Sequence, residues 1–487
     1  MQQALLLDVL GGGEPPDDLL GENYCVEHEP HSRRAHGITL TPAWLVERML
    51  DQLGSQSFDT VVDCGAGTGR FAIAAARRFP RARVVAVEAH PEMAILLRQR
   101  LWETGLSQRV EVVEGDFRDE RVRRQGRTLF LGNPPYVRHH DISPQWKAWY
   151  EHGMAARGVR ASQLAGLHAH FMLRAIEQMR AGDHLCFVTS AEWLDNGYGR
   201  ALRELCFSDG VALQSLWVTE PGELVFPDAL VSAAVFELSC QQPSDRIRVG
   251  SIAGQKFNHL RDVEHASLRA APRWSIWARR ELDVQGDGVE LGELFRVTRG
   301  QVTGQNDFWV LPPDQQVLPA SLTTRAVTRA AEIIAGDVLS RSGVRQLKVV
   351  ADLPADLDAL STEEARLAKR FVQLARKMDA HQSYIARHRK PWWAVGMREP
   401  PAAFVSYMGR RPPVFRGNPH GVSFLNIAHG LYPRQPVSPA QLDSILRHLN
   451  QTTSINSGRI YGGGLAKFEP SDIARLRIPA GVFEGGA

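Results

Sequence analysis

Hydrophobic positions follow two different rhythms along the first half of the chain. Between residues 60 and 238, short continuous apolar runs alternate with stretches in which apolar side chains recur every three or four positions. The runs predict buried strands, and the stretches predict helices that cover them. Strands are expected at 60–63, 83–88, 110–114, 128–131, 184–189, 213–218 and 231–238, and helices near 69–79, 91–103, 162–180 and 192–206. This alternation indicates a doubly wound α/β fold, with a parallel sheet of seven strands that helices cover on both faces.

The same rhythm is absent at both ends of the chain. Residues 11–36 show no period and are expected to form a leader or loop. Order begins at Thr41 and Pro42, a predicted helix cap with proline at the first helical position. After about residue 240 the segments become irregular, with long helical stretches near 362–388 and 439–450. The predicted division is a leader, an α/β domain and a mixed α+β domain, at residues 1–35, 36–245 and 246–487.

The composition is that of an ordinary globular protein, which excludes a disordered, collagenous or disulfide-stapled chain. The 487 residues include 57 Lys plus Arg and 54 Asp plus Glu, and 44% are hydrophobic. The two halves differ, because residues 1–245 hold 24 basic and 32 acidic side chains and residues 246–487 hold 33 and 22. The five scattered cysteines lack C-x-x-C spacing, and no apolar stretch is long enough for a membrane span. We therefore expect a cytoplasmic protein without a membrane anchor.

A glycine-rich turn follows the first predicted strand. The sequence from Asp63 to Gly69, DCGAGTG, places Gly65, Gly67 and Gly69 between a strand and a helix. Glycine lets a ligand approach the backbone, and the helix N-terminus offers free N–H donors. Glu88 ends the next strand, where a carboxylate can accept both hydroxyls of a ribose. The turn predicts a nucleotide-like cofactor; by itself it leaves open a dinucleotide or a merely tight connection.

A second candidate site follows the fourth predicted strand, in Asn133, Pro134, Pro135 and Tyr136. Two consecutive prolines restrict φ and remove two N–H donors, so their carbonyls can point into a pocket. The Asn133 side-chain oxygen and one such carbonyl can accept the two hydrogens of an exocyclic amine, while Tyr136 offers a stacking face. The simpler alternative is a stiff turn at the end of a strand.

The ordered set of motifs resembles the gamma-class (TaqI-type, Eco57I-like) N6-adenine-specific DNA methyltransferases of bacterial restriction-modification systems. The resemblance starts with the TP-containing segment 37–42 and continues through the glycine turn, the acid at Glu88 and the NPPY sequence. Residues 225–227, VFP, resemble the segment whose Phe stacks on the target base. Residues 299–308 and 457–479 resemble the opening and closing segments of the target recognition domain. One departure is DCGAGTG, where many relatives have DPACGSG.

This resemblance implies a Rossmann-like class I methyltransferase domain with a mostly parallel seven-stranded sheet at 36–245, and a mixed α+β DNA target recognition domain at 246–487. The cofactor would be S-adenosylmethionine, and the reaction would methylate N6 of an adenine flipped out of double-stranded DNA. The residues implied to hold the cofactor are Thr41, Pro42, Asp63, Gly65, Gly67, Gly69, Glu88, Asp116, Phe117 and Asn133. The residues implied in catalysis are Asn133, Pro134, Pro135, Tyr136 and Phe226. Neither list includes a metal ligand, and no metal is expected, because Cys25, His28 and His31 lack a fourth ligand at suitable spacing.

Residues 365–416 hold twelve cations against Asp379 and Glu399, interleaved with aromatic side chains. Such a mixture suits contacts with DNA phosphates and stacking or wedging between bases. The alternative is a hydrophobic core of aromatics beneath a solvated face of arginines. The candidate DNA-binding residues are Arg299, Thr303, Arg389, Lys390, Arg410, Arg411 and Arg416.

The partners expected from the sequence are double-stranded DNA and, where a nuclease exists, a separate restriction endonuclease. None of the seven lysines has Asp or Glu two residues before it, as a fused nuclease would normally require. The protein is expected to act as a monomer in the cytoplasm, associated with the nucleoid. The alternatives left open are a cytosine N4 or RNA amino-methyltransferase, and a non-catalytic DNA-recognition subunit with this fold.

Overall fold

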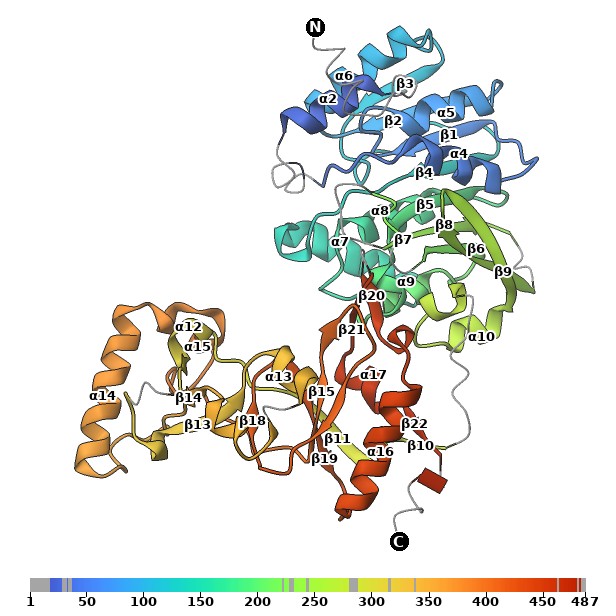
Figure 1. Cartoon of the computed structure of the whole chain (residues 1–487). Helices are drawn as coiled ribbons and strands as arrows, with labels where there is room; N and C mark the ends of the chain where they lie inside the picture. The colour runs from blue at the N-terminus through green and yellow to red at the C-terminus, as the bar shows by residue number, and fades with distance from the viewer. Residues whose placement is uncertain are drawn as a thin grey trace, which may run out of the picture. The chain divides into compact units, whose positions relative to one another are not determined.

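A computed structural model of the chain forms two compact units (Figure 1). The first comprises Met1–Leu282 with Tyr461–Gly463, and the second Asp283–Ile460 with Gly464–Ala487. The structure describes residues 18–28, 33, 37–220, 223–226, 232–241, 245–279, 288–313, 317–336, 339–461, 464–479 and 481–482.

The first unit is built on a sheet of nine strands in the order β3-β2-β1-β4-β5-β7-β6-β8-β9. The strands are β1 (Thr60–Cys64), β2 (Arg83–Glu88), β3 (Val110–Glu114), β4 (Thr128–Gly132), β5 (His184–Ser190), β6 (Ala212–Thr219), β7 (Ala233–Ser239), β8 (Arg246–Ala253) and β9 (Lys256–Glu264). The pairs β5–β7, β6–β7 and β8–β9 are antiparallel, and the other five pairs are parallel. The mostly parallel α/β sheet is confirmed, and each of the seven expected strands lies within two residues of its expected bounds.

Two strands lie beyond the expected seven, and they move the boundary between the units. β8 pairs in parallel with β6, and its side chains Ile247, Val249 and Ile252 are buried. The predicted boundary near residue 245 is therefore wrong, because β8 and β9 complete the first sheet and the division falls after Leu282. Residues 246–282 carry eight basic and three acidic side chains, so the first unit holds 32 and 35 and the second 25 and 19. The charge difference between the units is thus smaller than the halves of the sequence suggested.

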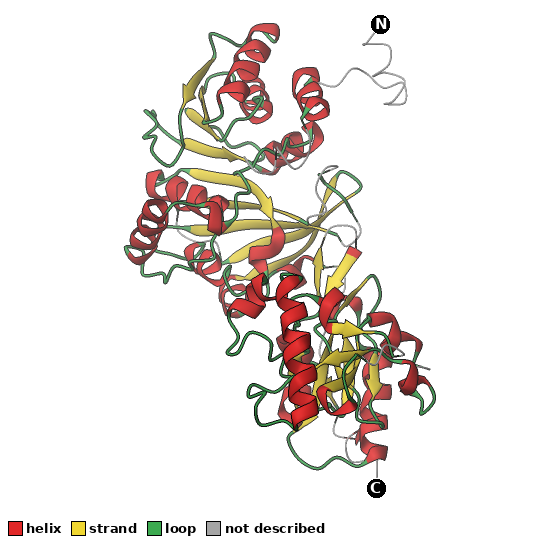
Figure 2. Ribbon diagram, turned by 90° about the vertical axis from the view of Figure 1, so that its left-hand side faces the viewer, coloured by secondary structure: helices red, strands yellow, loops and turns green. Residues whose placement is uncertain are grey.

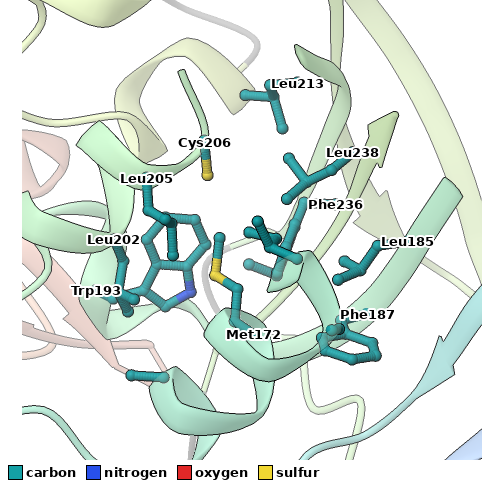
Figure 3. Packing of buried hydrophobic residues seen from close by; sticks show 14 of the residues in the cluster. Met172, Leu185, Phe187, Trp193, Leu202, Leu205, Cys206, Leu213, Phe236 and Leu238 are labelled. Carbon is teal, nitrogen blue, oxygen red and sulfur yellow. The ribbon is translucent and has the colours of Figure 1, made fainter. Parts of the chain in front are cut away.

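Helices cover both faces of this sheet (Figure 2). They are α2 (Leu19–Glu27), α4 (Ala43–Gln52), α5 (Arg70–Arg78), α6 (Pro91–Glu103), α7 (Pro144–Ala155), α8 (Leu167–Gln178), α9 (Arg200–Leu205) and α10 (His265–Ala270), with short 3₁₀ helices η1 (His139–Asp141), η2 (Ala191–Leu194) and η3 (Ser275–Ala278). Neighbouring strand residues enter opposite cores, so Val61 lies in one hydrophobic cluster and Val62 in the other. Figure 3 shows the second of these cores, where Trp193 packs edge-to-face on Phe236 with ring centres 5.3 Å apart.

Several local expectations differ from the observed helices. Within residues 11–36, where a leader or loop is expected, residues 19–27 form α2; its apolar residues follow no stripe that would reveal it. α4 begins at Ala43 with Pro42 as its N-cap, so the Thr41 hydroxyl does not cap this helix. The stretch 192–206 is interrupted into η2 and α9, and α7 was not anticipated. Neither α2 nor α7 has a strong apolar stripe, so tertiary contacts rather than a periodic face stabilise these two helices.

The second unit contains four small sheets, ordered β10-β22, β11-β19-β15-β17, β12-β14-β13-β18 and β16-β21-β20. Its strands are β10 (Val289–Glu290), β11 (Phe295–Arg299), β12 (Val310–Leu311), β13 (Thr323–Val327), β14 (Val349–Ala351), β15 (Ala403–Ser406), β16 (Met408–Gly409), β17 (Phe415–Gly417), β18 (Ser423–Phe424), β19 (Ala428–Pro433), β20 (Arg459–Tyr461), β21 (Leu465–Lys467) and β22 (Arg477–Ile478). Its helices are α11 (Leu291–Leu294), α12 (Asn306–Trp309), α13 (Ala330–Ala335), α14 (Thr362–Lys377), α15 (Tyr384–Arg387), α16 (Pro439–Thr452) and α17 (Pro470–Ala474), with 3₁₀ turns η4 (Ala320–Leu322), η6 (Gly343–Gln346), η7 (Ala380–Gln382) and η8 (Ile455–Ser457). The mixed α+β character expected for this part of the chain is confirmed. No helix in the described ranges has the length and apolarity that a membrane crossing needs.

Candidate functional site

A cavity of about 280 Å³ lies at the carboxyl ends of β1, β2, β3 and β4. The strand order reverses between β1 and β4, and open α/β sheets bind ligands in the crevice outside such a reversal. Seven residues that the sequence singled out line this cavity, namely Gly65, Gly67, Glu88, Asp116, Phe117, Asn133 and Pro135. The fold thus brings together motifs that are spread over more than sixty residues of the sequence.

The glycine turn and Glu88 form one wall of the cavity. Gly65 and Gly67 have φ of 89° and 54°, a left-handed conformation that favours glycine. Glu88 accepts a hydrogen bond from Gly67 N–H through Oε2 and from His90 N–H through Oε1, each at 2.7 Å. Burial raises the pKa of the Glu88 carboxyl. A carboxylate has about four lone-pair sites, so Glu88 can also accept a hydrogen bond from a hydroxyl group of a ligand.

Gly69 and Asp63 lie outside the cavity and stabilise the conformation of the glycine turn. Gly69 has a φ of 84°, and a side chain there would place Cβ 2.3 Å from Leu97 Cδ1. Asp63 is fully buried and accepts a hydrogen bond from Ala72 N–H at 2.9 Å, which ties the end of β1 to the first turn of α5. Neither residue lines the cavity. Both support the conformation of the turn.

We expect the stability of the folded protein to depend on pH through the ionisation of Asp63. Burial, with a smaller contribution from the charge of Glu88, raises the pKa of Asp63 to about 8, whereas an unfolded aspartate titrates near 3.9. The folded protein therefore holds a proton that the unfolded chain releases, so this residue lowers stability as the pH rises from about 4 to about 8. Relative to the wild type, Asp63→Asn should gain in Tm across that interval and differ by a constant amount above it. Thermal melts between pH 4 and 9 test this; a Tm difference that does not change with pH would contradict it.

Asp116 and Phe117 form another part of the cavity wall. Both Asp116 oxygens accept hydrogen bonds from Arg118, whose guanidinium lies 4.0 Å from the ring centre of Trp146. The Phe117 ring lies 5.4 Å from that of Phe171 on α8, and both rings line the cavity. The wall thus combines a fixed carboxylate with two aromatic surfaces. Phe171 was not singled out from the sequence, because a helix prediction does not say which face meets the cavity.

Asn133 has a fixed orientation. Its Nδ2 donates to Thr39 O at 3.2 Å and lies 3.1 Å from Thr41 Oγ1. Because a backbone carbonyl can only accept, the amide nitrogen must face Thr39, and this assigns the other position to Oδ1. Among the described residues Oδ1 is buried and has no hydrogen-bond partner. An acceptor of this kind on a cavity wall is suited to a ligand that brings a donor.

The remaining predicted site residues of this unit lie around that wall. Pro135 lines the cavity and Pro134 is buried. Tyr136 has a buried hydroxyl whose pKa is raised by burial, and its ring lies 6.2 Å from that of His168. Pro42 lines a second cavity, of about 310 Å³, beside α2 and α5. Phe226 is 1% exposed within a hydrophobic cluster and does not line the first cavity; Pro227, next to it, is outside the described residues.

In the second unit, the seven candidate DNA-binding residues form a group that is buried or half-buried and a group that is exposed. Thr303 is buried and bonds Asn306 and Gln305, while Arg389 and Arg416 are half-buried and donate to backbone carbonyls. The exposed members are Arg299, Lys390, Arg410 and Arg411. Of the interleaved aromatics, Phe404 and Phe415 are core residues, as the alternative interpretation expected. Only part of the basic segment is therefore available to a ligand.

Three family models match the chain. A general methyltransferase domain matches residues 61–132, the Eco57I restriction-modification methylase matches 98–218, and the C-terminal domain of the type II methyltransferase M.Eco57I matches 275–485. The type II methyltransferase M.XamI of Xanthomonas campestris pv. amaranthicola is 43% identical over 459 residues, which are 92% of this chain and 86% of M.XamI. The chain belongs to the Eco57I-like restriction-modification methylases.

Other similarities agree with this placement of the methylase. The type II methyltransferase M.AccI of Acinetobacter calcoaceticus is 20% identical over 383 residues, 72% of this chain and 69% of M.AccI. The type IIL restriction-modification enzyme MmeI, solved in complex with DNA, superposes with a TM-score of 0.57 at 13% identity, over 98% of this chain and 66% of MmeI. DrdV, also solved with DNA, gives 0.52 at 12% identity, over 87% and 51%. At such identities the two structures show a shared fold.

The methylase is an S-adenosylmethionine-dependent DNA methyltransferase. The residues of the cavity fit this cofactor. Glu88 would accept hydrogen bonds from the ribose hydroxyls, and the rings of Phe117 and Phe171 would contact the adenine. Gly65 and Gly67 have no side chains, so the cofactor can approach the backbone closely there. The cavity volume of about 280 Å³ is near the lower end of the range for small-molecule sites.

Proposed function

We propose that this methylase transfers a methyl group to N6 of an adenine flipped out of double-stranded DNA, as the modification component of a restriction-modification or related defence system, or as an orphan methylase. The observation that carries the proposal is Asn133, whose amide nitrogen is held by Thr39 and Thr41 while Oδ1, beside the cavity, is buried and has no partner within the described part of the chain. An exocyclic amine supplies the donor that this acceptor lacks.

The chemistry requires the base to leave the duplex, at a cost of a few kcal/mol. Asn133 Oδ1 and the carbonyl of Pro134 would accept the two amine hydrogens, which directs the nitrogen lone pair toward the cofactor. The cofactor supplies a methyl group already activated by its positive sulfur. Orientation of the amine then contributes much of the rate, and the released proton passes to solvent.

Two aromatic residues are proposed to hold the flipped base. Tyr136 follows the two prolines, so its ring would stack on a base whose amine reaches Asn133. Phe226 would stack on the opposite face, as the resemblance of residues 225–227 implies. Because its side chain is buried in a hydrophobic cluster, this role requires the Phe226 ring to leave that cluster when DNA binds.

The direct test is incubation of the full-length protein with S-adenosylmethionine and plasmid DNA, followed by nucleoside mass spectrometry and modification-sensitive sequencing. N6-methyladenine within one short sequence motif is the expected result. N4-methylcytosine would replace adenine by cytosine in the proposal, and methylation of RNA alone would refute it. Absence of any transfer, with cofactor and DNA both bound, would indicate a non-catalytic recognition subunit.

The second unit is proposed to contact DNA phosphates through its exposed cations. Counterion release makes the logarithm of the binding constant fall with the logarithm of salt concentration, by about 0.9 per neutralised phosphate. The double variant Lys390→Ala/Arg411→Ala should bind DNA more weakly and lower that slope by about 2. The matched control is Arg447→Ala on α16, whose exposed guanidinium already pairs with Asp443. Fluorescence anisotropy over a salt series measures both; an unchanged slope in the double variant would contradict the assignment.

The oligomeric state of the enzyme, its location and its nuclease partner are part of the same proposal. We infer that the enzyme acts as a monomer in the cytoplasm beside the nucleoid, and that any cognate restriction endonuclease is a separate protein. Sedimentation of the free protein and of its DNA complex tests the monomeric state, and a dimer on DNA would overturn it.

A further inference from the structure

A buried carboxylate outside the known motifs is bonded directly to the cofactor turn. Asp18 is 3% exposed and precedes α2. Its Oδ1 accepts from Gly21 N–H at 2.9 Å and lies 3.0 Å from Arg100 Nε. Its Oδ2 accepts from Thr68 Oγ1 at 2.5 Å and from Arg70 Nε at 2.7 Å. One aspartate thus joins α2 to three residues that lie on α5, on α6 and in the turn between β1 and α5.

Thr68 carries the only polar side chain in the turn from Gly65 to Gly69. Its hydroxyl donates to Asp18, and its carbonyl accepts from Arg100 Nη1 at 2.7 Å. The three glycines of this turn have positive φ and a large conformational freedom in the unconstrained chain. The contacts at Thr68 restrict that freedom, and Thr68 does not itself line the cavity, which Gly65 and Gly67 line.

A second branch of the network leads to the catalytic asparagine. Arg70, bonded to Asp18, donates through Nη1 to Thr41 O at 2.9 Å. Thr41 Oγ1 lies 3.1 Å from Asn133 Nδ2. Glu22, on α2, accepts from Arg70 Nη2 at 2.5 Å and adds a second contact between this helix and Arg70.

Two buried arginines depend on the negative charge of Asp18. The side chains of Arg70 and Arg100 are 11% and 6% exposed, and both face this carboxylate. The charge and hydrogen bonds of Asp18 raise the pKa of Arg70 against the opposing effect of burial. Loss of this carboxylate would remove a negative charge that both buried guanidinium groups face, which is strongly unfavourable, so the two arginines, and Thr68 with them, would rearrange.

We propose that Asp18 is a positioning residue for S-adenosylmethionine: through Thr68 and Arg70 it holds the glycine turn in its binding conformation before the cofactor arrives. A preorganised turn pays no ordering entropy on binding, so the network raises cofactor affinity. It has little effect on the chemical step once the cofactor is bound. The proposal requires cofactor binding alone and is independent of which base is methylated.

The test compares two buried threonines of the full-length enzyme. Thr68→Val removes the hydroxyl that donates to Asp18, and Thr60→Val removes one that donates to Gln125 O at 2.8 Å, at the opposite end of β1. Thr68→Val should weaken S-adenosylmethionine binding about tenfold, because hydrogen bonds to charged groups are the stronger kind. Its kcat at saturating cofactor and its KM for DNA should stay close to those of the wild type. Thr60→Val should lower Tm without changing the cofactor Kd.

Two further variants complete the test. Thr68→Ser keeps the hydroxyl and should restore the wild-type Kd, while Asp18→Asn should weaken cofactor binding at least as much as Thr68→Val. Calorimetric titration with S-adenosylmethionine gives Kd, and steady-state kinetics separates KM from kcat. The proposal is overturned if folded Thr68→Val binds the cofactor as tightly as Thr60→Val does, whether or not Asp18→Asn folds. A fall in kcat with an unchanged Kd would also overturn it.

Discussion

Replacing Asn133 by alanine should lower the rate of methyl transfer at saturating substrates by about a thousandfold, the loss expected when one oriented polar group is removed from a reacting centre. The cofactor should still bind, because the glycine turn and Glu88 are untouched. The physical reason is orientation: in the proposed mechanism Oδ1 is the buried acceptor that directs the amine, and no other described residue of the cavity holds a side-chain amide there. Radioactive methyl transfer measures the rate and calorimetry measures cofactor affinity.

The matched control for this prediction is Asn258→Ala, since Asn258 lies on β9 at the far edge of the same sheet. It should methylate DNA at the wild-type rate. Normal turnover by Asn133→Ala would refute the role assigned to the asparagine. Loss of cofactor binding together with activity would instead show that Asn133 is needed to form the cavity.

Glu88→Gln should weaken S-adenosylmethionine binding by about 10- to 100-fold, since hydrogen bonds to a charged group contribute about 1.5 to 3 kcal/mol each. In the wild type both oxygens accept backbone N–H groups, from Gly67 and His90. A glutamine must turn its NH₂ group toward one of these donors, so the substitution also disturbs the turn. Calorimetric titration measures the change in Kd.

The control for Glu88 lies on the neighbouring strand. Glu114 ends β3 directly opposite Glu88, but it is exposed and pairs with Arg98. Glu114→Gln should leave the cofactor Kd unchanged. A pH series adds a second criterion: the raised pKa of Glu88 means that the carboxylate proposed to bind the cofactor becomes protonated as the pH falls through that pKa. Cofactor affinity should therefore decline toward acid pH in the wild type and less in Glu88→Gln.

Local patterns predicted the elements that form the site. β2, β3 and α6 have the bounds expected from the sequence, because apolar periodicity, glycine and proline act within a few residues of the chain. The contacts between these elements could not be predicted from local patterns. Thr41 and Asn133 were both singled out, yet their hydrogen bond joins residues 92 positions apart, and no local pattern reports it.

Composition was a weaker guide in the second unit. Thr303 lies in the segment 299–308 that resembles the family, and Phe415 lies in the basic, aromatic segment 365–416. The fold buries both side chains. Arg416 instead donates to the backbone carbonyls of Ile333 and Ile334. An arginine beside an aromatic residue has the same composition whether it faces DNA or supports a loop, so only its neighbours in space distinguish the two.

The sequence by itself determined the α/β sheet, the glycine turn, the acid that follows it and the NPPY loop, because each is a property of consecutive residues. The tertiary structure alone decided which of these residues meet at one cavity, that β8 and β9 extend the first unit to Leu282, and that Asp63 supports the turn from beneath. It also decided the position of Asp18, which looked like part of a leader. A buried carboxylate is stable only beside its partners, and the partners of Asp18 come from a turn and two helices that folding brings together.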